Sequence, residues 1–289
     1  MSDGRKRYAQ VGIGGRSNMF MDGILDSFKD HAEHVGVCDV NLTRARAQLD
    51  LHKEFLGDRE VPMYHARDFD RMIAEQKPAT VIVTTGPDVT HAQYICRALE
   101  LGCDVVTEKP MTTDEVRCRR ILRTVSETGR NCQVTFNYRY APVRSQVCEL
   151  LRDGVIGEVL SVDFCWLLDT RHGADYFRRW HRRRENSGSL LVHKATHHFD
   201  LVNWWLDDVP AEVFCQGSLR YYTPEHAEAL GLGDRAERCL HCPAAERCNF
   251  HVNLAERERH KALYLDCEAE DNYYRDRCVF SDQLNIWDT

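Results

Sequence analysis

The stretch that decides the fold is Tyr8-Ala-Gln-Val-Gly-Ile-Gly-Gly-Arg-Ser-Asn18. Its short apolar start predicts a buried strand, and three glycines follow where that strand must turn sharply into a helix. Glycines let backbone N–H groups approach a pyrophosphate, and the N-terminus of the next helix adds a partial positive charge. The G-x-G-x-x-G pattern would have a third glycine at position 17, where this chain has serine, so the turn alone is weak evidence. The residues expected to contact phosphates are Gly12, Gly14, Gly15, Arg16 and Ser17.

The residues after the turn strengthen this interpretation. Apolar residues between Phe20 and Phe28 have helical spacing, and His34 to Asp39 predicts a second strand that ends in an acid. Asp39 lies somewhat beyond the distance of about 20 residues expected for the carboxylate that binds an adenosine ribose. A carboxylate at this place favours NAD, whereas Arg44 nearby leaves NADP open.

Length and composition exclude several classes of protein. The 289 residues allow two domains, which we place at residues 1–129 and 130–289. A net charge of −7 argues against nucleic-acid binding, and a mean hydropathy of −0.50 without a long apolar run argues against a membrane span. The first residues do not resemble a targeting signal, and most of the 13 scattered cysteines should be reduced. We therefore expect a cytoplasmic protein that acts on a small molecule.

A third strand, Val81 to Thr85, ends in the loop Gly86-Pro-Asp88, before a helix from Thr90 to Leu101. Ligands of open α/β sheets bind at the carboxyl ends of the strands. The residues expected on the nicotinamide side are therefore Thr84, Thr85, Pro87 and His91. His91 could equally be a structural residue at the start of the helix.

The next strand, Cys103 to Thr107, leads into Glu108-Lys109-Pro110. A lysine at the end of a strand and beside a cofactor can stabilise the alkoxide that develops as hydride leaves an alcohol. Proline restricts the following backbone and so helps to fix where the lysine points. Without the glycine turn, a surface lysine would be the simpler interpretation.

After a further strand, Cys132 to Phe136, the chain resembles the glucose-fructose oxidoreductase and inositol dehydrogenase family, Gfo/Idh/MocA. The resemblance covers nearly the whole chain and rests on the glycine turn, Asp39, Thr85-Gly-Pro87 with His91, Glu108-Lys109-Pro110, Asn137-Tyr-Arg139 and a histidine segment. It implies a doubly wound Rossmann domain followed by an α+β domain. That second domain should contain an open, mostly antiparallel sheet that forms the substrate pocket.

Patterns in the second half agree with that expectation. Residues 160–168 alternate between apolar and polar, as an antiparallel strand does, and Ala211 to Arg220 predicts another strand. The arginine-rich stretch Arg171 to Arg184 predicts a loop, either merely solvated or covering a substrate. In the second case Tyr176, Trp180 and His181 would stack on a sugar, or the arginines would bind an acidic ligand. The chain stops within an apparent new element, so we expect a shortened domain whose open sheet edge favours a homo-oligomer.

Gly188 to Trp205 resembles the family's catalytic segment. The resemblance makes His197 the base, and on one continuous helix His193 would share its face while Asp200 would orient it. The family commonly has aspartate at the position of His193, so this chain departs from the usual acid–base pair. A histidine-rich helix by itself is more often structural or metal-binding. His193 would bind a sugar hydroxyl or share the proton relay with His197 as a further catalytic residue. Other residues expected to contact substrate are Arg139, Lys194 and His198.

Three cysteines near the end of the chain, Cys239, Cys242 and Cys248, have a spacing that suits zinc. Cys278, Cys267, His241 and His251 are all available as the fourth ligand. The resemblance makes Cys278 our first choice, because some sugar-oxidising members of the family carry a similar cysteine. Reduced thiols without a metal, or disulfides, remain open alternatives.

Together these features predict an NAD-dependent dehydrogenase that oxidises a secondary alcohol of a sugar, glycoside or inositol. Within the family, the histidine run and the cysteine segment most resemble members that oxidise glycosides at the sugar 3-hydroxyl, which narrows the expectation. Two alternatives remain: a glycosidase that retains its NAD through each turnover, and a non-catalytic dinucleotide-binding protein.

Overall fold

The computed structural model describes residues 4–289. Its first half is built on a six-stranded parallel sheet with the strand order β3-β2-β1-β4-β5-β6. The strands are β1 (Lys6–Val11), β2 (Ala32–Asp39), β3 (Met63–His65), β4 (Thr80–Val83), β5 (Asp104–Thr107) and β6 (Cys132–Val134). This is the predicted doubly wound order, in which the strand sequence reverses between β1 and β4.

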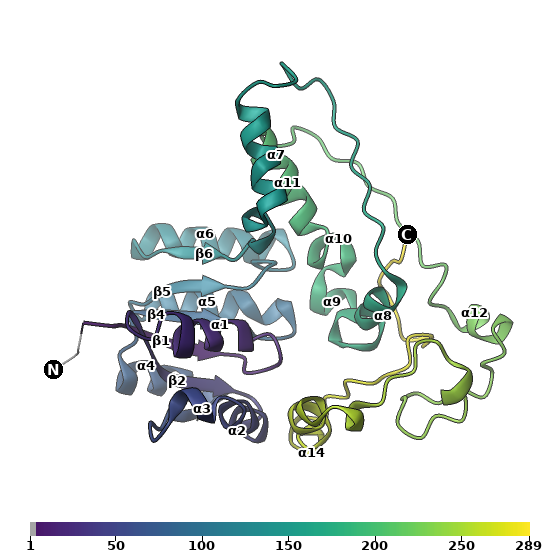
Figure 1. The fold of residues 1–289 in the computed structure, drawn as a ribbon, viewed down its shortest axis with the longest axis horizontal. Coiled ribbons are helices and arrows are strands. Elements are labelled where there is room, and N and C mark those ends of the chain that lie inside the picture. The colour runs from purple at the N-terminus through teal and green to yellow at the C-terminus, as the bar shows by residue number, and fades with distance from the viewer. Residues whose placement is uncertain (1–3) are drawn as a thin grey trace.

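Helices cover both faces of this sheet (Figure 1). They are α1 (Asn18–Asp22), α2 (Leu42–Asp50), α3 (Lys53–Leu56), α4 (Phe69–Gln76), α5 (His91–Glu100) and α6 (Glu115–Thr128). Local sequence fixes several of their ends. Asn41 caps α2 by accepting from Arg44 N, Asp114 caps α6 by accepting from Arg117 N, and Gly129 ends α6 in the left-handed conformation.

The core of the first half lies between the strands and α5 and α6. Val81 and Val83 of β4 are fully buried and pack with Ile95 of α5 and Ile121 of α6. Strands buried on both faces are continuous apolar runs, which is why their positions could be predicted. The rigid sheet presents the carboxyl ends of β1, β4 and β5 at one edge, and the loops that follow them carry the candidate site.

The second half consists of short helices and long irregular segments. The helices are α7 (Pro142–Arg152), α8 (Thr170–Arg178), α9 (Arg184–Ser187), α10 (Ser189–His193), α11 (Thr196–Leu206), α12 (Pro224–Ala229), α13 (Glu258–His260) and α14 (Glu268–Asp271). An aromatic cluster of Phe177, Tyr222, Phe250 and Phe280 forms its core. Figure 1 shows α8, α9 and α10 facing the carboxyl edge of the sheet. Within residues 4–289, no helix is both long enough and apolar enough to cross a bilayer.

The prediction of antiparallel strands in the second half is wrong at both places. Residues 158–169 and 211–220 are irregular, and Leu160 is 89% exposed. A strand needs a hydrogen-bonded neighbour, and among the described residues neither segment pairs with another strand. Figure 1 shows both segments as unpaired connections, one leading from α7 to α8 and the other from α11 to α12. The alternating pattern therefore does not form an open sheet in this part of the chain.

Candidate active site

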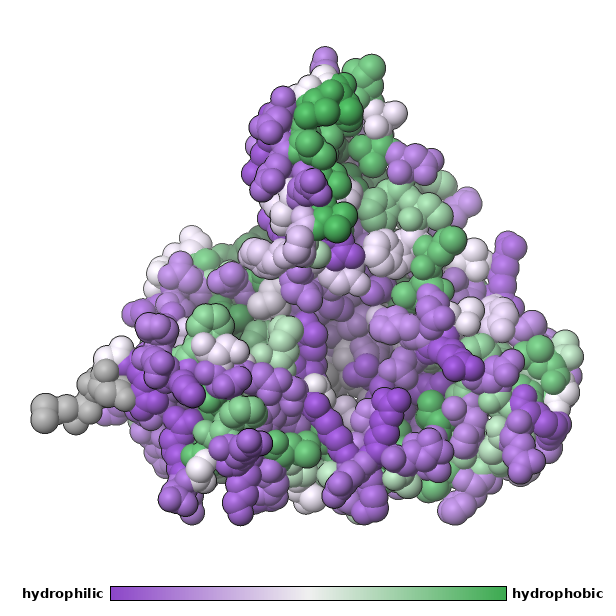
Figure 2. All heavy atoms as spheres, in the orientation of Figure 1, coloured by the Kyte–Doolittle hydropathy of each residue, from purple (hydrophilic) through white to green (hydrophobic). Residues whose placement is uncertain are grey.

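A cleft of about 580 Å3 lies between the carboxyl edge of the sheet and helices α8, α10 and α11. Figure 2 shows the molecule hollowed between these two parts. Most of the residues predicted from the sequence line it. They are Gly12, Gly14, Gly15, Arg16, Asp39, Arg44, Thr84, Thr85, Pro87, His91, Glu108, Lys109, Tyr176, Trp180, His181, His193, Lys194 and His197.

The glycine turn at the end of β1 forms one wall of the cleft. Gly12 has a φ of +87°, and a Cβ atom there would collide with the backbone of Thr85, so the position requires glycine. Thr84 Oγ1 donates to the Gly12 carbonyl at 2.7 Å and ties the turn to β4. Ser17 is fully buried and donates from Oγ to the Gly14 carbonyl at 2.7 Å. Ser17 therefore shapes the turn from behind and does not face the cleft as predicted.

Asp39 lies at the end of β2, as the sequence predicts. Its two carboxylate oxygens accept from Ile13 N at 2.5 Å and from Asn41 N at 2.8 Å. Burial raises the pKa of Asp39, while the Arg44 guanidinium and these two amides act in the opposite direction. The carboxylate is thus fixed next to the glycine turn, where a ribose hydroxyl would need an acceptor.

Lys109 lines the cleft from the loop that follows β5. Its Nζ donates to the His193 carbonyl at 2.9 Å and lies 3.3 Å from His193 Nε2. Burial lowers the pKa of Lys109 to about 8, although the charges of Asp88 and Glu108 act against this shift. Glu108 is itself held by Arg16 at 2.7 Å, which links the glycine turn to the lysine loop.

Behind His193 lies Asp88, which the sequence analysis treated only as part of a loop. Asp88 Oδ2 is 2.5 Å from His193 Nδ1, and both side chains are buried. Burial raises the pKa of Asp88, and burial together with Lys109 lowers the pKa of His193. The contacts therefore assign a neutral His193 that donates from Nδ1 to Asp88 and accepts at Nε2 from Lys109. An acid directly after a strand-end loop was the available signal for Asp88.

His197 lines the same cleft, but not in the predicted way. The turn at Lys194 and Ala195 interrupts the helix, so His193 ends α10 while His197 lies in α11. The His197 ring stacks on Tyr138 at 3.9 Å, and its Nδ1 is buried without a hydrogen-bond partner. Burial, followed by the charges of Lys109 and Lys194, lowers the pKa of His197 to about 3.

Asp200 does not orient His197, contrary to the prediction. Its carboxylate binds Arg139, at 2.8 Å from Nε and 2.5 Å from Nη2, and a bidentate guanidinium is the stronger partner. Arg139 is thereby held outside the lining of the cleft. His198 also lies outside this lining, because its ring packs 4.7 Å from Trp166. Neither residue is placed to contact a substrate there.

The arginine-rich stretch is mainly helical, not the predicted loop. Asp169 caps α8 by accepting from His172 N, and Ala174 and Phe177 bury the inner face of the helix. Tyr176, Trp180 and His181 nevertheless line the cleft, with the Trp180 and His181 rings stacked at 3.6 Å.

His91 has both of its predicted features. It is the first residue of α5, and it also lines the cleft. Its Nδ1 lies 2.9 Å from the Pro110 carbonyl and its Nε2 lies 2.9 Å from the Thr85 carbonyl. His91 therefore holds together the loops that follow β4 and β5.

The predicted zinc site is not supported. Cys239, Cys242, Cys248 and Cys278 are all free thiols that line one small cavity. Among residues 4–289, however, no three histidine, cysteine or acidic side chains are placed to hold a metal ion. Burial raises the pKa of the Cys239 and Cys278 thiols.

Three further residues of the cleft come from a stretch without any recognisable motif. They are Tyr264, Asp271 and Tyr273. Gly15 N donates to the Tyr264 hydroxyl at 3.2 Å, at the turn where phosphate was expected. No local pattern could have indicated them, because only the tertiary fold brings them to the first half of the chain.

The Rossmann sheet and the glycine turn, faced by helices of the second half, are typical of dinucleotide-binding oxidoreductases. Comparison with known families agrees. Residues 6–136 match an oxidoreductase family with an NAD-binding Rossmann fold, and residues 148–258 match its C-terminal α/β domain. The chain belongs to this family, Gfo/Idh/MocA, as its motifs suggested.

Individual relatives lie in the same family. The chain is 39% identical to the putative oxidoreductase YteT of Bacillus subtilis, over 98% of this chain and 67% of that protein. It is 31% identical to an inositol 2-dehydrogenase of Rhizobium meliloti, over 51% of this chain and 42% of that protein. A crystal structure of a putative myo-inositol dehydrogenase from Sinorhizobium meliloti has a similar fold, with a TM-score of 0.56 and 24% identity. That match covers 74% of this chain and 59% of the other.

Proposed function

We propose that the protein is an NAD-dependent dehydrogenase that oxidises a secondary alcohol of a sugar, glycoside or inositol. The observation that carries the proposal is the placement of Lys109 and His197 in one cleft with the glycine turn. The name of the Rhizobium relative, an inositol 2-dehydrogenase, supports a polyol substrate.

The cleft fits a dinucleotide. Gly14 has open space where a Cβ would lie, and the Asp39 carboxylate lines the same cleft beside the turn. A bound NAD would supply the acceptor for the hydride. Thr85 and Pro87, at the end of β4, would border its nicotinamide, because ligands of such sheets lie beyond the carboxyl ends of the strands.

The side chains around Lys109 supply the rest of the chemistry. The Lys109 ammonium binds the substrate oxygen and stabilises the negative charge that develops on it. His197 is the candidate acceptor of the hydroxyl proton: its imidazole is neutral in this cleft, although the burial and lysine charges that lower its pKa to about 3 also make it a weak base. Asp88 acts through His193: it fixes the tautomer that leaves Nε2 free to accept from Lys109, and so it holds the ammonium in place.

The opposite wall suits a ring with several hydroxyls. Trp180 and Tyr176 offer aromatic faces, which pack on the apolar face of a sugar. Lys194 donates from Nζ to the Tyr138 hydroxyl at 2.9 Å and so orders the ring that stacks on His197. These groups position a polyol without requiring a charge on the substrate.

The proposal is tested by NADH formation on a panel of sugars, glycosides and inositols, with wild type and Lys109→Ala. We expect turnover on at least one member of the panel and a loss of kcat of about 1,000-fold in the variant, since a positioned electrostatic group contributes about that much. NAD affinity should change little. The narrower expectation, oxidation at a sugar 3-hydroxyl, is checked by product analysis on the glycosides.

The alternatives give different results in the same assay. Release of free sugar without net NADH would identify a glycosidase that regenerates its cofactor. NAD binding without turnover on any member of the panel would identify a non-catalytic dinucleotide-binding protein. Either result would overturn the proposed dehydrogenase activity.

A further inference from the structure

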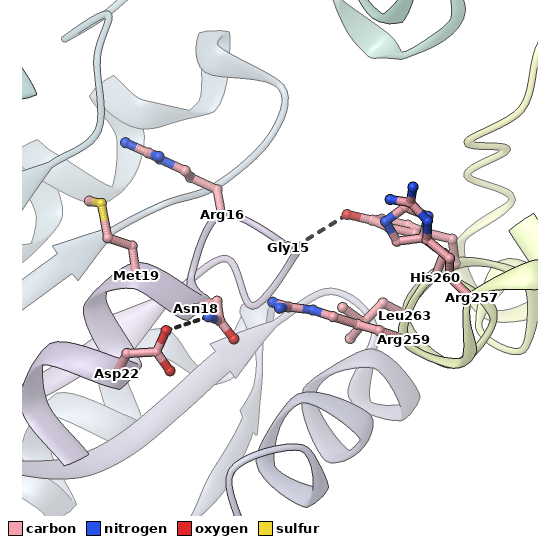
Figure 3. A pocket seen from close by; sticks show the side chains of 10 residues that line it. Gly15, Arg16, Asn18, Met19, Asp22, Arg257, Arg259, His260 and Leu263 are labelled. Carbon is pink, nitrogen blue, oxygen red and sulfur yellow. Dashed lines mark hydrogen bonds between the residues drawn. The ribbon is translucent and has the colours of Figure 1, made fainter. Parts of the chain in front are cut away.

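A segment far along the chain, residues 257–273, covers one end of the cleft. Glu270 of this segment bonds to the start of α2, and Figure 1 shows α14 near α2. Figure 3 shows Arg257, Arg259 and His260 facing the glycine turn across a cavity of about 550 Å3. The segment contacts both α2 and the glycine turn. It therefore borders the part of the cleft where the adenosine half of a dinucleotide would bind.

Asp271 of this segment determines what Arg44 can bind. An arginine near the end of β2 is the group that accommodates the 2′-phosphate in NADP-dependent Rossmann domains. Here Arg44 Nη2 lies 2.7 Å from Asp271 Oδ2, and Nη1 lies 3.6 Å from Asp39 Oδ1. Its Nε donates to the Leu263 carbonyl at 3.0 Å, and the side chain is only 8% exposed. Two carboxylates and a carbonyl therefore already bind this guanidinium.

Glu270 occupies the second place where a phosphate could bind. Its carboxylate accepts from Leu42 N at 2.7 Å and from Thr43 N at 3.1 Å, at the N-terminus of α2. The amides of a helix N-terminus otherwise form a ready anion site. A 2′-phosphate near α2 would thus meet the carboxylates of Asp39, Glu270 and Asp271 and amides that are already bonded.

We propose that Asp271, assisted by Glu270, makes the site select NAD over NADP. The selectivity is then set largely by the second half of the chain, which binds the arginine and the helix terminus that a 2′-phosphate would need. Asp39 can still accept from a ribose hydroxyl, because each of its oxygens has a second lone pair. This inference rests on the proposed use of a dinucleotide, but it concerns binding alone.

The test compares the Kd of NAD⁺ and of NADP⁺ by isothermal titration calorimetry on the full chain, without substrate. The variants are Asp271→Asn and Glu270→Gln. Asp266→Asn is the matched control, because Asp266 lies in the same segment but pairs with Lys261 at 3.0 Å. Wild type should bind NAD about 100-fold more tightly than NADP, and Asp271→Asn should reduce this ratio about tenfold, because a carboxylate close to the phosphate is removed. Glu270→Gln should act in the same direction, and Asp266→Asn should leave the ratio unchanged.

Wild type that binds NADP as tightly as NAD would overturn the inference. The inference would also be overturned if the Asp271→Asn variant melts at the same temperature as wild type and has the same ratio of Kd values for NADP⁺ and NAD⁺. If Asp271→Asn shows no thermal unfolding transition, the Glu270→Gln variant replaces it. A ratio of the two Kd values equal to that of wild type in this variant would then overturn the inference. Selective NAD binding without turnover would refute the proposed activity while supporting this inference, and binding of neither nucleotide would refute both.

Discussion

Replacing Asp88 with asparagine removes a negative charge that favours the ammonium form of Lys109. The two groups are connected through His193, with contacts of 2.5 Å on one side of the imidazole and 3.3 Å on the other. Including the width of the ring, the charges lie about 8 Å apart. With an effective dielectric constant of about 20, their attraction is worth about 2 kcal/mol.

The consequence is a shift in the pH dependence of activity. The pKa of Lys109 is about 8, because burial favours the neutral amine more strongly than Asp88 and Glu108 favour the ammonium. Without the Asp88 charge the pKa of Lys109 falls further. If the ammonium stabilises the alkoxide as proposed, activity is lost as the pH rises through this pKa, and the loss begins at lower pH in the variant. The loss of about 2 kcal/mol corresponds to about 30-fold in the protonation equilibrium, so at pH 8, where wild type is itself half protonated, we expect kcat to fall by about 15-fold.

The assay is the pH profile of NADH formation for wild type, Asp88→Asn and Asp70→Asn. Asp70 is an exposed acid on α4 that pairs with Arg97, so its removal should leave the profile unchanged. NAD affinity and melting temperature are measured for the same variants. If Asp88 had only a structural role, Asp88→Asn would change these two quantities and not the pH at which kcat is lost on the alkaline side. An Asp88→Asn variant with kcat within about twofold of wild type and the same alkaline limb would refute the reasoning.

Two further predictions concern stability. Gly12→Ala should lower the free energy of unfolding, measured with urea, by about 3 kcal/mol or more, because Gly12 has a φ of +87° and a Cβ there collides with the Thr85 backbone. Gly14→Ala is the control: a Cβ there meets open space, so it should cost about 1 kcal/mol or less. Equal effects of the two variants would contradict this. His34 is fully buried, which lowers its pKa to about 3, so below pH 6.5 the unfolded chain binds a proton that the folded protein does not. The free energy of unfolding should therefore decrease as the pH falls below 6.5, by about 1.4 kcal/mol per pH unit for this residue. His34→Gln should make the dependence of this free energy on pH less steep, and a variant as pH-dependent as wild type would contradict the prediction.

The Rossmann half was predictable because its signals are local. Five apolar runs next to glycines or acids predicted strands that lie within a few residues of β1, β2, β4, β5 and β6. β3 was not predicted, because Met63–His65 is short and carries no apolar run. Buried parallel strands are distinctive in sequence since both of their faces must be apolar.

The second half was predicted less well, because an alternating pattern identifies an apolar face but not the element that pairs with it or packs against it. Alternation in residues 160–168 indicates one apolar face, yet a strand also requires a neighbouring strand, which no local pattern can supply. Helical spacing likewise placed His193 and His197 on one face, but the turn at Lys194 separates them. Their convergence in the cleft depends on tertiary packing and not on that spacing.

Residues that act through long-range contacts left only weak signals in the sequence. Asp88 was visible only as a loop acid, and Asp271 only as one acid in a polar stretch. Each acquires its candidate role from a partner in the other half of the chain, His193 for Asp88 and Arg44 for Asp271. A prediction made one motif at a time cannot see such pairs.

The contact between Asp88 and His193 also bears on the departure at position 193, where family members commonly have aspartate. A carboxylate still lies behind the lysine, but it comes from the loop after β4 and acts through an imidazole. Burying a carboxylate, an imidazole and an ammonium together destabilises the folded protein. Binding a dinucleotide does not by itself require this arrangement. Perturbed, mutually bonded ionisable groups in a cleft are typical of catalytic sites. The contacts of His193 therefore support the proposed dehydrogenase, with its carboxylate placed differently, over the non-catalytic alternative.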